Sequence, residues 1–246
     1  MITDGLRRLV RFGIPLVLRQ FYAQARRRYR DSASGIRLRN EIGGAHWPIR
    51  TELAQIVIQG QLYENKLSNL RRGALMIDQS LIHPGNHWSF WERVGKPSVG
   101  NGFLEGRNIV EGQLVRQVGG GLCQLSSLVY HLALLGGMEI VERHPHSIDI
   151  YREHERFTPL GADATVVWGF KDLRLKNPYQ FAISMGCFLD GERLVGQLRS
   201  EETIPQLEVL FDREEITPGR VRVRTIVRGK TQAVTEYEQR PGLRVL

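Results

Sequence analysis

One cysteine stands where its side chain would be unusually reactive. Cys123 ends the stretch Gly119-Gly120-Gly121-Leu122-Cys123 and is followed by Gln124. The next apolar residues recur three and four positions apart, which predicts a helix over residues 123–135 with one buried face. A thiol at a helix N-terminus faces unpaired N–H groups and the positive end of the helix dipole, which both favour the thiolate. Cys123 is therefore the candidate nucleophile, and the first-turn N–H groups with the Gln124 amide are candidates to hold an oxyanion.

Two histidines and one aspartate further along the chain supply candidate partners for this thiol. His144 and His146 flank Pro145 at the start of an expected strand, and alternate positions of a strand face the same side. Either imidazole is a candidate base for Cys123. We favour His146, because Pro145 stiffens the chain before it. Asp163 is the candidate that orients the imidazole and stabilises its cation, as the third group of a catalytic triad does.

Other residues around the cysteine are candidates for substrate binding. Gly119, Gly120 and Gly121 have no side chains, so we expect a substrate backbone to approach the sulfur closely. Gln124, Ser126 and Arg143 complete the predicted contacts. For Ser126, one turn into the helix, capping or packing is the alternative role.

A metal site is an alternative use of the same side chains. His144, His146 and Cys123, with His154 as a further ligand, are of the types that bind zinc. Neither Cys-x-x-Cys nor His-Glu-x-x-His spacing supports such a site. We therefore expect no metal and no other cofactor. The second cysteine, Cys187, lies in an apolar run and is predicted to be part of the core.

The elements that must position these residues change type along the chain. Helical periodicity predicts a helix over residues 63–81, which the Pro84-Gly85 pair follows. After the cysteine-led helix, strand patterns occur at residues 139–142, 147–151, 164–168, 181–185, 193–198 and 221–227. Asp190-Gly191 and Arg228-Gly229-Lys230 are candidate hairpin turns. Helices followed by antiparallel strands predict an α+β fold in which the cysteine-led helix packs on the sheet.

Charge is concentrated at the N-terminus. The chain has 246 residues and a net charge of +8, and residues 1–30 hold eight arginines against one acidic residue, Asp4. The rest of the chain is therefore almost neutral. A nucleic-acid enzyme usually spreads basic residues over its folded body, so we expect no nucleic-acid partner.

The basic N-terminal segment mixes arginines with apolar residues. This composition is typical of an amphipathic helix on an anionic membrane surface, and a solvated or packed helix is the alternative. Pro15 and Arg19 interrupt the apolar stretch that a cleaved secretory signal needs, and no apolar run approaches the length of a membrane span. We therefore expect a cytoplasmic or membrane-surface location, and an extracytoplasmic one if the chain cross-links the cell wall.

Several stretches together resemble the VanW family. They are residues 69–78, Pro84-Gly85 with Ser89-Phe90, residues 119–130 around Cys123, residues 142–147 around the two histidines, residues 161–165 around Asp163, and residues 172–177. The resemblance covers about residues 60–185, and its Gly-Gly-Gly-x-Cys-Gln element is specific. It implies bacterial cell-wall work, and some members are understood as peptidoglycan L,D-transpeptidases that use a cysteine. Applied to this sequence, Cys123 would attack the stem peptide and His146 would move the protons.

Two functions and three segments follow from these observations. The first function is cysteine-dependent acyl transfer or hydrolysis on peptidoglycan stem peptides. The second is a non-catalytic module that binds wall peptides or precursors at the membrane surface, accessory to glycopeptide resistance. The order Cys–His–Asp and the cysteine-led helix are similar to the transglutaminase and papain-like arrangement. We expect a basic N-terminal segment over residues 1–45, a VanW-like core over 46–200 and a C-terminal β extension over 201–246.

Overall fold

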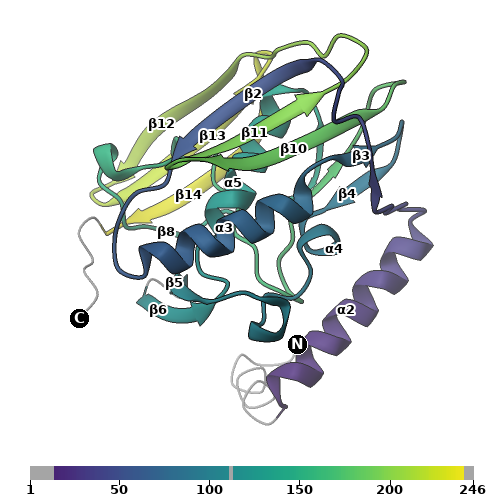
Figure 1. The fold of residues 1–246 in the computed structure, drawn as a ribbon. Helices are drawn as coiled ribbons and strands as arrows, with labels where there is room; N and C mark the ends of the chain where they lie inside the picture. Colours follow the sequence, from purple (N-terminus) through teal and green to yellow (C-terminus); the bar gives the residue numbers. More distant parts are fainter. Residues whose placement is uncertain (1–13, 111–112, 241–246) are drawn as a thin grey trace.

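The computed structural model describes residues 14–110 and 113–240 and has an α+β architecture. Few helices are combined with several sheets whose strands are mostly antiparallel (Figure 1). The predicted fold class is therefore confirmed at this level.

The largest sheet has five strands in the order β1-β3-β10-β11-β2, and all neighbours are antiparallel. Its strands are β1 (Glu41–Ile42), β2 (Ile49–Ile56), β3 (Ser80–Ile82), β10 (Ile183–Asp190) and β11 (Arg193–Arg199). A tight turn joins β10 to β11, and Gly191 in it has a positive φ of 59°, which glycine adopts without strain. The hairpin predicted at Asp190-Gly191 is confirmed.

Two helices, α3 (Tyr63–Ile77) and α5 (Leu122–Leu135), pack against this sheet and against each other. The central helix is α5, whose Leu125, Leu128 and Leu132 are fully buried. Burying one leucine side chain contributes about 2 kcal/mol, so this face anchors α5 firmly in the core. Cys187, on β10, is also buried in this core, as its apolar surroundings predicted.

The helix predicted over residues 63–81 ends earlier than expected. In the structure α3 stops at Ile77, and residues 80–82 form β3 instead. Gln79 takes a left-handed conformation (φ 59°), and the Ser80 hydroxyl donates to the Ile77 carbonyl at 2.5 Å. These two local features turn the chain into the sheet before Pro84 is reached.

Three smaller sheets complete the fold. A three-stranded sheet has the order β4-β9-β7, a hairpin joins β5 to β6, and a four-stranded sheet has the order β12-β13-β14-β8. Their bounds are β4 (His87–Ser89), β5 (Glu105–Val110), β6 (Gln113–Val118), β7 (Glu139–Glu142), β8 (Ile148–Asp149), β9 (Arg174–Lys176), β12 (Val209–Thr217), β13 (Arg220–Val227) and β14 (Lys230–Gln239). The remaining short helices are α4 (Phe90–Val94), Val99–Asn101 and Glu153–Glu155. The predicted turn at residues 228–230 joins β13 to β14.

The strand predicted over residues 164–168 is wrong. Residues 164–166 have no regular secondary structure, Val167 forms only an isolated bridge with Lys171, and Trp168 begins a turn. The backbone of this segment is bound by the hydroxyls of α5 instead: Ser126 donates to the Ala164 carbonyl at 2.6 Å, and the Ala164 N–H donates to Ser127 Oγ at 3.0 Å. The alternating apolar pattern reflects packing against a helix rather than a place in a sheet.

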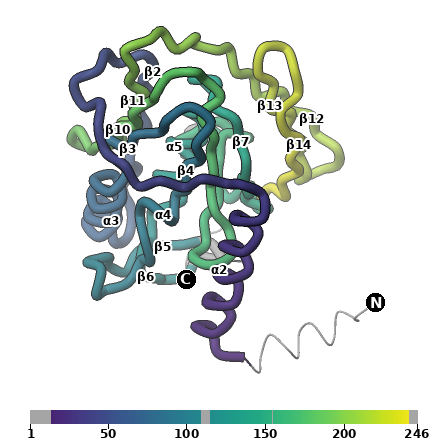
Figure 2. Tube along the Cα trace, turned by 90° about the vertical axis from the view of Figure 1, so that its right-hand side faces the viewer, coloured from purple at the N-terminus to yellow at the C-terminus, as the bar shows by residue number. Residues whose placement is uncertain are grey.

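The N-terminal helix α2 (Leu16–Ala33) projects away from the rest of the molecule (Figure 2). It has no buried residue, and ion pairs attach it: Arg27 binds Glu142, and Asp31 receives two hydrogen bonds of 2.7 Å from Arg174. Among the residues that the structure describes, no helix is long and apolar enough to cross a bilayer. Residues 1–13 of the predicted amphipathic segment lie outside the described residues.

The glycines before α5 have a packing role. A Cβ on Gly120 would collide with the backbone of Gly106 on β5 and stand 2.7 Å from the Arg107 nitrogen. The buried side chain of Asn69 on α3 ties this contact together, because it donates to the carbonyls of Gly120 and Leu104 at 2.9 Å. The absence of a side chain at position 120 therefore lets β5, α3 and the start of α5 meet.

We expect Gly120→Ala to destabilise the protein by about 1–3 kcal/mol, because the added methyl group forces two backbones apart. The matched control is Gly100→Ala, whose Cβ would meet nothing within 4 Å and should change stability by less than about 0.5 kcal/mol. Urea unfolding of both variants measures the difference. Equal stabilities would show that the glycine contact is not a constraint.

Candidate active site

Cys123 is the second residue of α5, at the wall of a cavity. Its partly buried thiol lies 3.8 Å from the Val166 carbonyl and is hydrogen-bonded by the imidazole of His146. Burial alone would raise the pKa of the thiol. The hydrogen bond and positive charge of His146 outweigh burial, and the pKa of Cys123 lies below its ordinary value.

His146 is held for this contact by Asp163. Its Nδ1 lies 2.9 Å from Asp163 Oδ2, and its backbone N–H donates to the same oxygen at 2.7 Å. The Nδ1 proton therefore points to the carboxylate, which leaves Nε2 for the thiol. Burial lowers the pKa of His146, but hydrogen bonds to Asp163 and Cys123 raise it to about 10. A thiolate–imidazolium pair is the state that this geometry favours.

Asp163 is buried and is held in turn by two further side chains. Tyr237, on β14, donates its hydroxyl to Oδ1 at 2.5 Å, and Arg143 donates to the same oxygen at 3.0 Å. Burial would raise the pKa of Asp163, but the hydrogen bond of His146 and the charge of Arg143 hold it well below its usual range. The carboxylate is therefore ionised and able to stabilise the imidazolium.

Sequence reasoning did not find Tyr237. It lies in the C-terminal strands, 74 positions from Asp163, and no local motif surrounds it. The only sequence signal for Tyr237 is that a tyrosine occupies a buried position in a strand where buried and exposed residues alternate. Its contact means that the predicted C-terminal extension contributes directly to this site, whatever the domain boundaries are.

His144 is placed elsewhere. Its Nε2 lies 2.9 Å from Glu142 Oε1, its side chain is about a third exposed, and it does not line the cavity. Of the two candidate histidines, the structure thus brings His146 to Cys123 and Asp163. Backbone pairing explains why His146, rather than His144, reaches Asp163. The Thr165 N–H donates to the His144 carbonyl at 2.7 Å, which sets the segment around His144 beside the segment around Thr165.

Four predicted substrate contacts have internal roles instead. Ser126 is fully buried and donates to Ala164, and Arg143 holds Asp163 and donates to Thr235 Oγ1 at 2.8 Å. Gly120 packs on β5, as described above, and Gly119 packs on Pro97, so neither glycine lines the cavity. Only Gly121 and Gln124 of the predicted contacts border it. For the others, burial inside the framework leaves no path to a ligand.

Gln124 is also not free to act as predicted. Its side-chain amide donates to the Ile56 carbonyl at 3.0 Å, and its backbone N–H donates to Gly121 at 2.9 Å. Because first-turn N–H groups lack an intrahelical acceptor, the N–H of Cys123 itself is the better candidate for an oxyanion donor.

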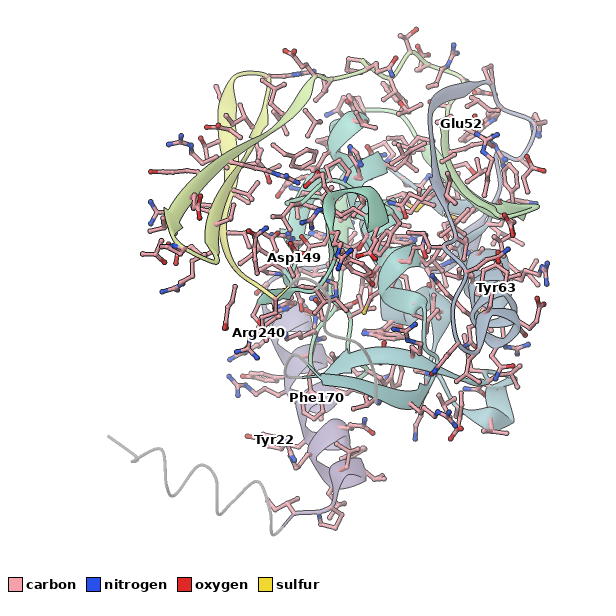
Figure 3. The ribbon with its side chains drawn as sticks, turned by 90° about the vertical axis from the view of Figure 1, so that its left-hand side faces the viewer. Tyr22, Glu52, Tyr63, Asp149, Phe170 and Arg240 are labelled. Atoms are coloured by element: carbon pink, nitrogen blue, oxygen red, sulfur yellow. The ribbon has the colours of Figure 1, made fainter. Side chains whose placement is uncertain are left out.

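The cavity beside the thiol has a volume of about 520 Å³. Figure 3 labels two of its lining residues, Tyr63 of α3 and Asp149 of β8. Cys123, His146 and Asp163 border it, and Lys66 and Arg107 form part of the wall. The sequence did not single out these two cations, because they stand on other elements, α3 and β5. Within residues 14–110 and 113–240, no three His, Cys, Asp or Glu side chains form a group suited to a metal ion.

Comparisons with known proteins point in one direction. The family described as VanW like protein matches residues 65–199, which include the cysteine, the histidine and the aspartate but not Tyr237. The vancomycin B-type resistance protein VanW of Enterococcus faecalis is 30% identical over 139 residues, 56% of this chain and 50% of that protein. The uncharacterized protein YoaR of Bacillus subtilis is 31% identical over 141 residues, 57% of this chain and 45% of that protein. The chain thus spans about half the length of these curated relatives, and no solved structure matches it significantly.

We expect alkylation of Cys123 to persist well below about pH 8.5, the pKa of an ordinary thiol, because His146 stabilises the thiolate. His146→Ala removes the strongest influence that opposes burial, so the reactive range should move to higher pH. Tyr237→Phe should cause a smaller shift, through Asp163. Rates of iodoacetamide labelling against pH, read by peptide mass spectrometry, measure these changes.

Two internal controls accompany this measurement. Cys187 should stay inert at neutral pH, because burial raises its pKa, and His144→Ala should leave the Cys123 profile unchanged. A wild-type profile with the pH dependence of an ordinary thiol would contradict the ion pair.

Proposed function

The chain belongs to the VanW family, and we propose that it is a cysteine-dependent acyltransferase acting on peptidoglycan stem peptides. The observation that carries the proposal is the hydrogen-bonded series Cys123–His146–Asp163 at the wall of a cavity large enough for a short peptide. This series has the three roles of nucleophile, base and orienting group.

The first half-reaction forms an acyl-enzyme. The Cys123 thiolate attacks the carbonyl carbon between the third and fourth residues of a stem peptide, and the Cys123 N–H donates to the developing oxyanion. His146 then gives its Nε2 proton to the amine nitrogen as the C–N bond breaks. The terminal D-Ala leaves as an amine, and a thioester remains on Cys123.

The second half-reaction transfers the acyl group. His146 is now neutral and takes a proton from an amine of another stem as that nitrogen attacks the thioester. The C–S bond breaks, a new amide forms, and the thiolate–imidazolium pair is restored. With water in place of the amine, the same steps give hydrolysis. Cross-linking of this kind takes place outside the cytoplasm, which is where the enzyme would act.

The arrangement of the three groups supports a further comparison. A cysteine at a helix start, followed in sequence by a histidine and an aspartate from extended segments, is the order used in transglutaminase and papain-like sites. We propose that the likeness is one of site geometry, since fold alone does not determine function.

We expect Cys123→Ala to lower the release of D-Ala from a tetrapeptide stem by about three orders of magnitude or more, because the nucleophile is lost. Cys187→Ala, the matched control, should retain activity. Liquid chromatography measures release, and intact-protein mass measures the acyl-enzyme. A folded Cys123→Ala variant with full activity would refute the proposal.

A second candidate function is a module that binds wall precursors at an anionic membrane surface. It fits the name of the Enterococcus relative, which ties that protein to vancomycin resistance rather than to catalysis. The observation that favours it is the orientation of α2. Gln20, Arg27 and Asp31 contact the body, whereas Leu18, Phe21, Tyr22 and Tyr29, on the other side of the helix, are each more than half exposed.

This outward apolar face is flanked by charge of one sign. Arg26 and Arg28 lie between Tyr22 and Tyr29 along the helix and are exposed. Tyr22 lies on the part of α2 that extends below the body (Figure 3). An apolar stripe bordered by arginines matches an anionic bilayer surface, where apolar side chains enter the interface and arginines meet lipid phosphates.

We expect Phe21→Ser to weaken binding to vesicles of phosphatidylcholine with phosphatidylglycerol by about tenfold, because it removes one buried apolar side chain. Leu75→Ser, which removes an exposed leucine from α3, is the matched control and should have no effect. Vesicle co-sedimentation measures both, and added salt should reduce binding. Equal binding of the two variants would exclude this role for α2.

A further inference from the structure

Two cations of the cavity wall form no ion pair with the part of the chain that the structure describes. Lys66 on α3 and Arg107 on β5 both line the cavity that holds Cys123. Burial and the charge of Arg107 lower the pKa of Lys66 to about 8, so the ammonium is still mostly protonated at neutral pH. The stem of Lys66 packs on Gly121, where a Cβ would stand 3.0 Å from its Cγ. This contact sets Lys66 beside the start of α5.

The carboxylates of the same cavity are already engaged. Asp149 receives hydrogen bonds of 2.7 and 2.6 Å from Arg156, and Asp163 is held by His146, Arg143 and Tyr237. Glu155 accepts the Arg152 N–H at 2.9 Å. Among the described residues, no carboxylate forms an ion pair with Lys66 or Arg107. The wall near the thiol therefore presents uncompensated positive charge.

A buried acceptor stands next to the nucleophile. Gln124 is 3% exposed and lines the cavity, and its Oε1 has no hydrogen-bond partner among the described residues. Donation of its amide to Ile56 determines which end of the side chain is the oxygen. A buried acceptor without a donor is costly, but this oxygen is itself fully buried and is not available to a ligand. The two cations of the wall therefore set the chemistry of the ligand, which is an anionic group.

We propose that Lys66 and Arg107 bind a carboxylate of the substrate. The inference rests on the proposed function for the identity of the ligand as a peptide. It adds that recognition depends on a free carboxylate near the scissile bond. A stem peptide offers such a carboxylate at the terminal D-Ala and at the free α-carboxyl group of the γ-linked D-Glu.

The charge of the wall can be measured without any substrate. Iodoacetate and iodoacetamide alkylate the same thiol, but only iodoacetate is an anion. At pH 7, Lys66→Met and Arg107→Met should each lower the iodoacetate-to-iodoacetamide rate ratio at Cys123 about fivefold, because each removes one positive charge from the wall of the cavity that holds the thiol. Methionine keeps the apolar stem that packs on Gly121. Arg71→Met removes a cation of α3 that does not line the cavity and should leave the ratio unchanged. An unchanged ratio in both cavity variants overturns the proposal.

Binding identifies the carboxylate. Full-length Cys123→Ala is titrated by calorimetry with the tetrapeptide stem, its C-terminal amide, and the same peptide with D-isoglutamine in place of D-Glu. Weaker binding of the amide assigns the terminal carboxylate, and weaker binding of the D-isoglutamine peptide assigns the α-carboxylate of D-Glu. In either case Lys66→Met should abolish the difference. Equal binding of all three peptides, or none at all, overturns the proposal. Carboxylate-dependent binding without turnover in the wild type would instead refute the proposed catalysis and leave this inference standing.

Discussion

The ionised carboxylate of Asp163 is the group on which the rest of the site depends. A buried carboxylate is costly unless several donors satisfy it. Here His146 supplies two donors, Tyr237 one and Arg143 one, and these residues come from two distant parts of the chain, residues 143–146 and β14. The charge of Asp163 keeps His146 protonated, and His146 in turn stabilises the thiolate of Cys123. The reactivity of a side chain on α5 is thus controlled partly by β14.

The approach of α5 to its neighbours is the second constraint. Gly120 lets the backbone of β5 come into contact with the helix start, and Asn69 joins this contact to α3. The same junction brings Arg107 of β5 and Lys66 of α3 to the cavity. The glycines before Cys123 therefore act on the ligand site indirectly, by permitting the elements that carry its cations to pack there.

Charge is divided between two regions with different roles. The exposed arginines of α2 surround an apolar face that turns away from the body, whereas Arg27 of the same helix is used to attach it. In the cavity, by contrast, Asp149 and Asp163 are paired with arginines, whereas no carboxylate of the described residues forms an ion pair with Lys66. The nearly neutral net charge of the body thus conceals two unpaired cations in the wall of the cavity that holds the nucleophile.

The sequence by itself determined the cysteine-led helix, the α+β class, two hairpin turns and the identity of three chemical groups. These follow from local rules: helical periodicity, turn residues and a thiol at a helix start act within a few positions. Tertiary structure alone decided between His144 and His146, because the choice depends on how residues 144–146 pair with residues 163–166. It also decided that Ser126 binds backbone, that residues 164–168 are not a strand, and that Tyr237, Lys66 and Arg107 join the site. Those contacts join positions far apart in the chain, and packing of the sheets and helices, rather than any local pattern, brings them together.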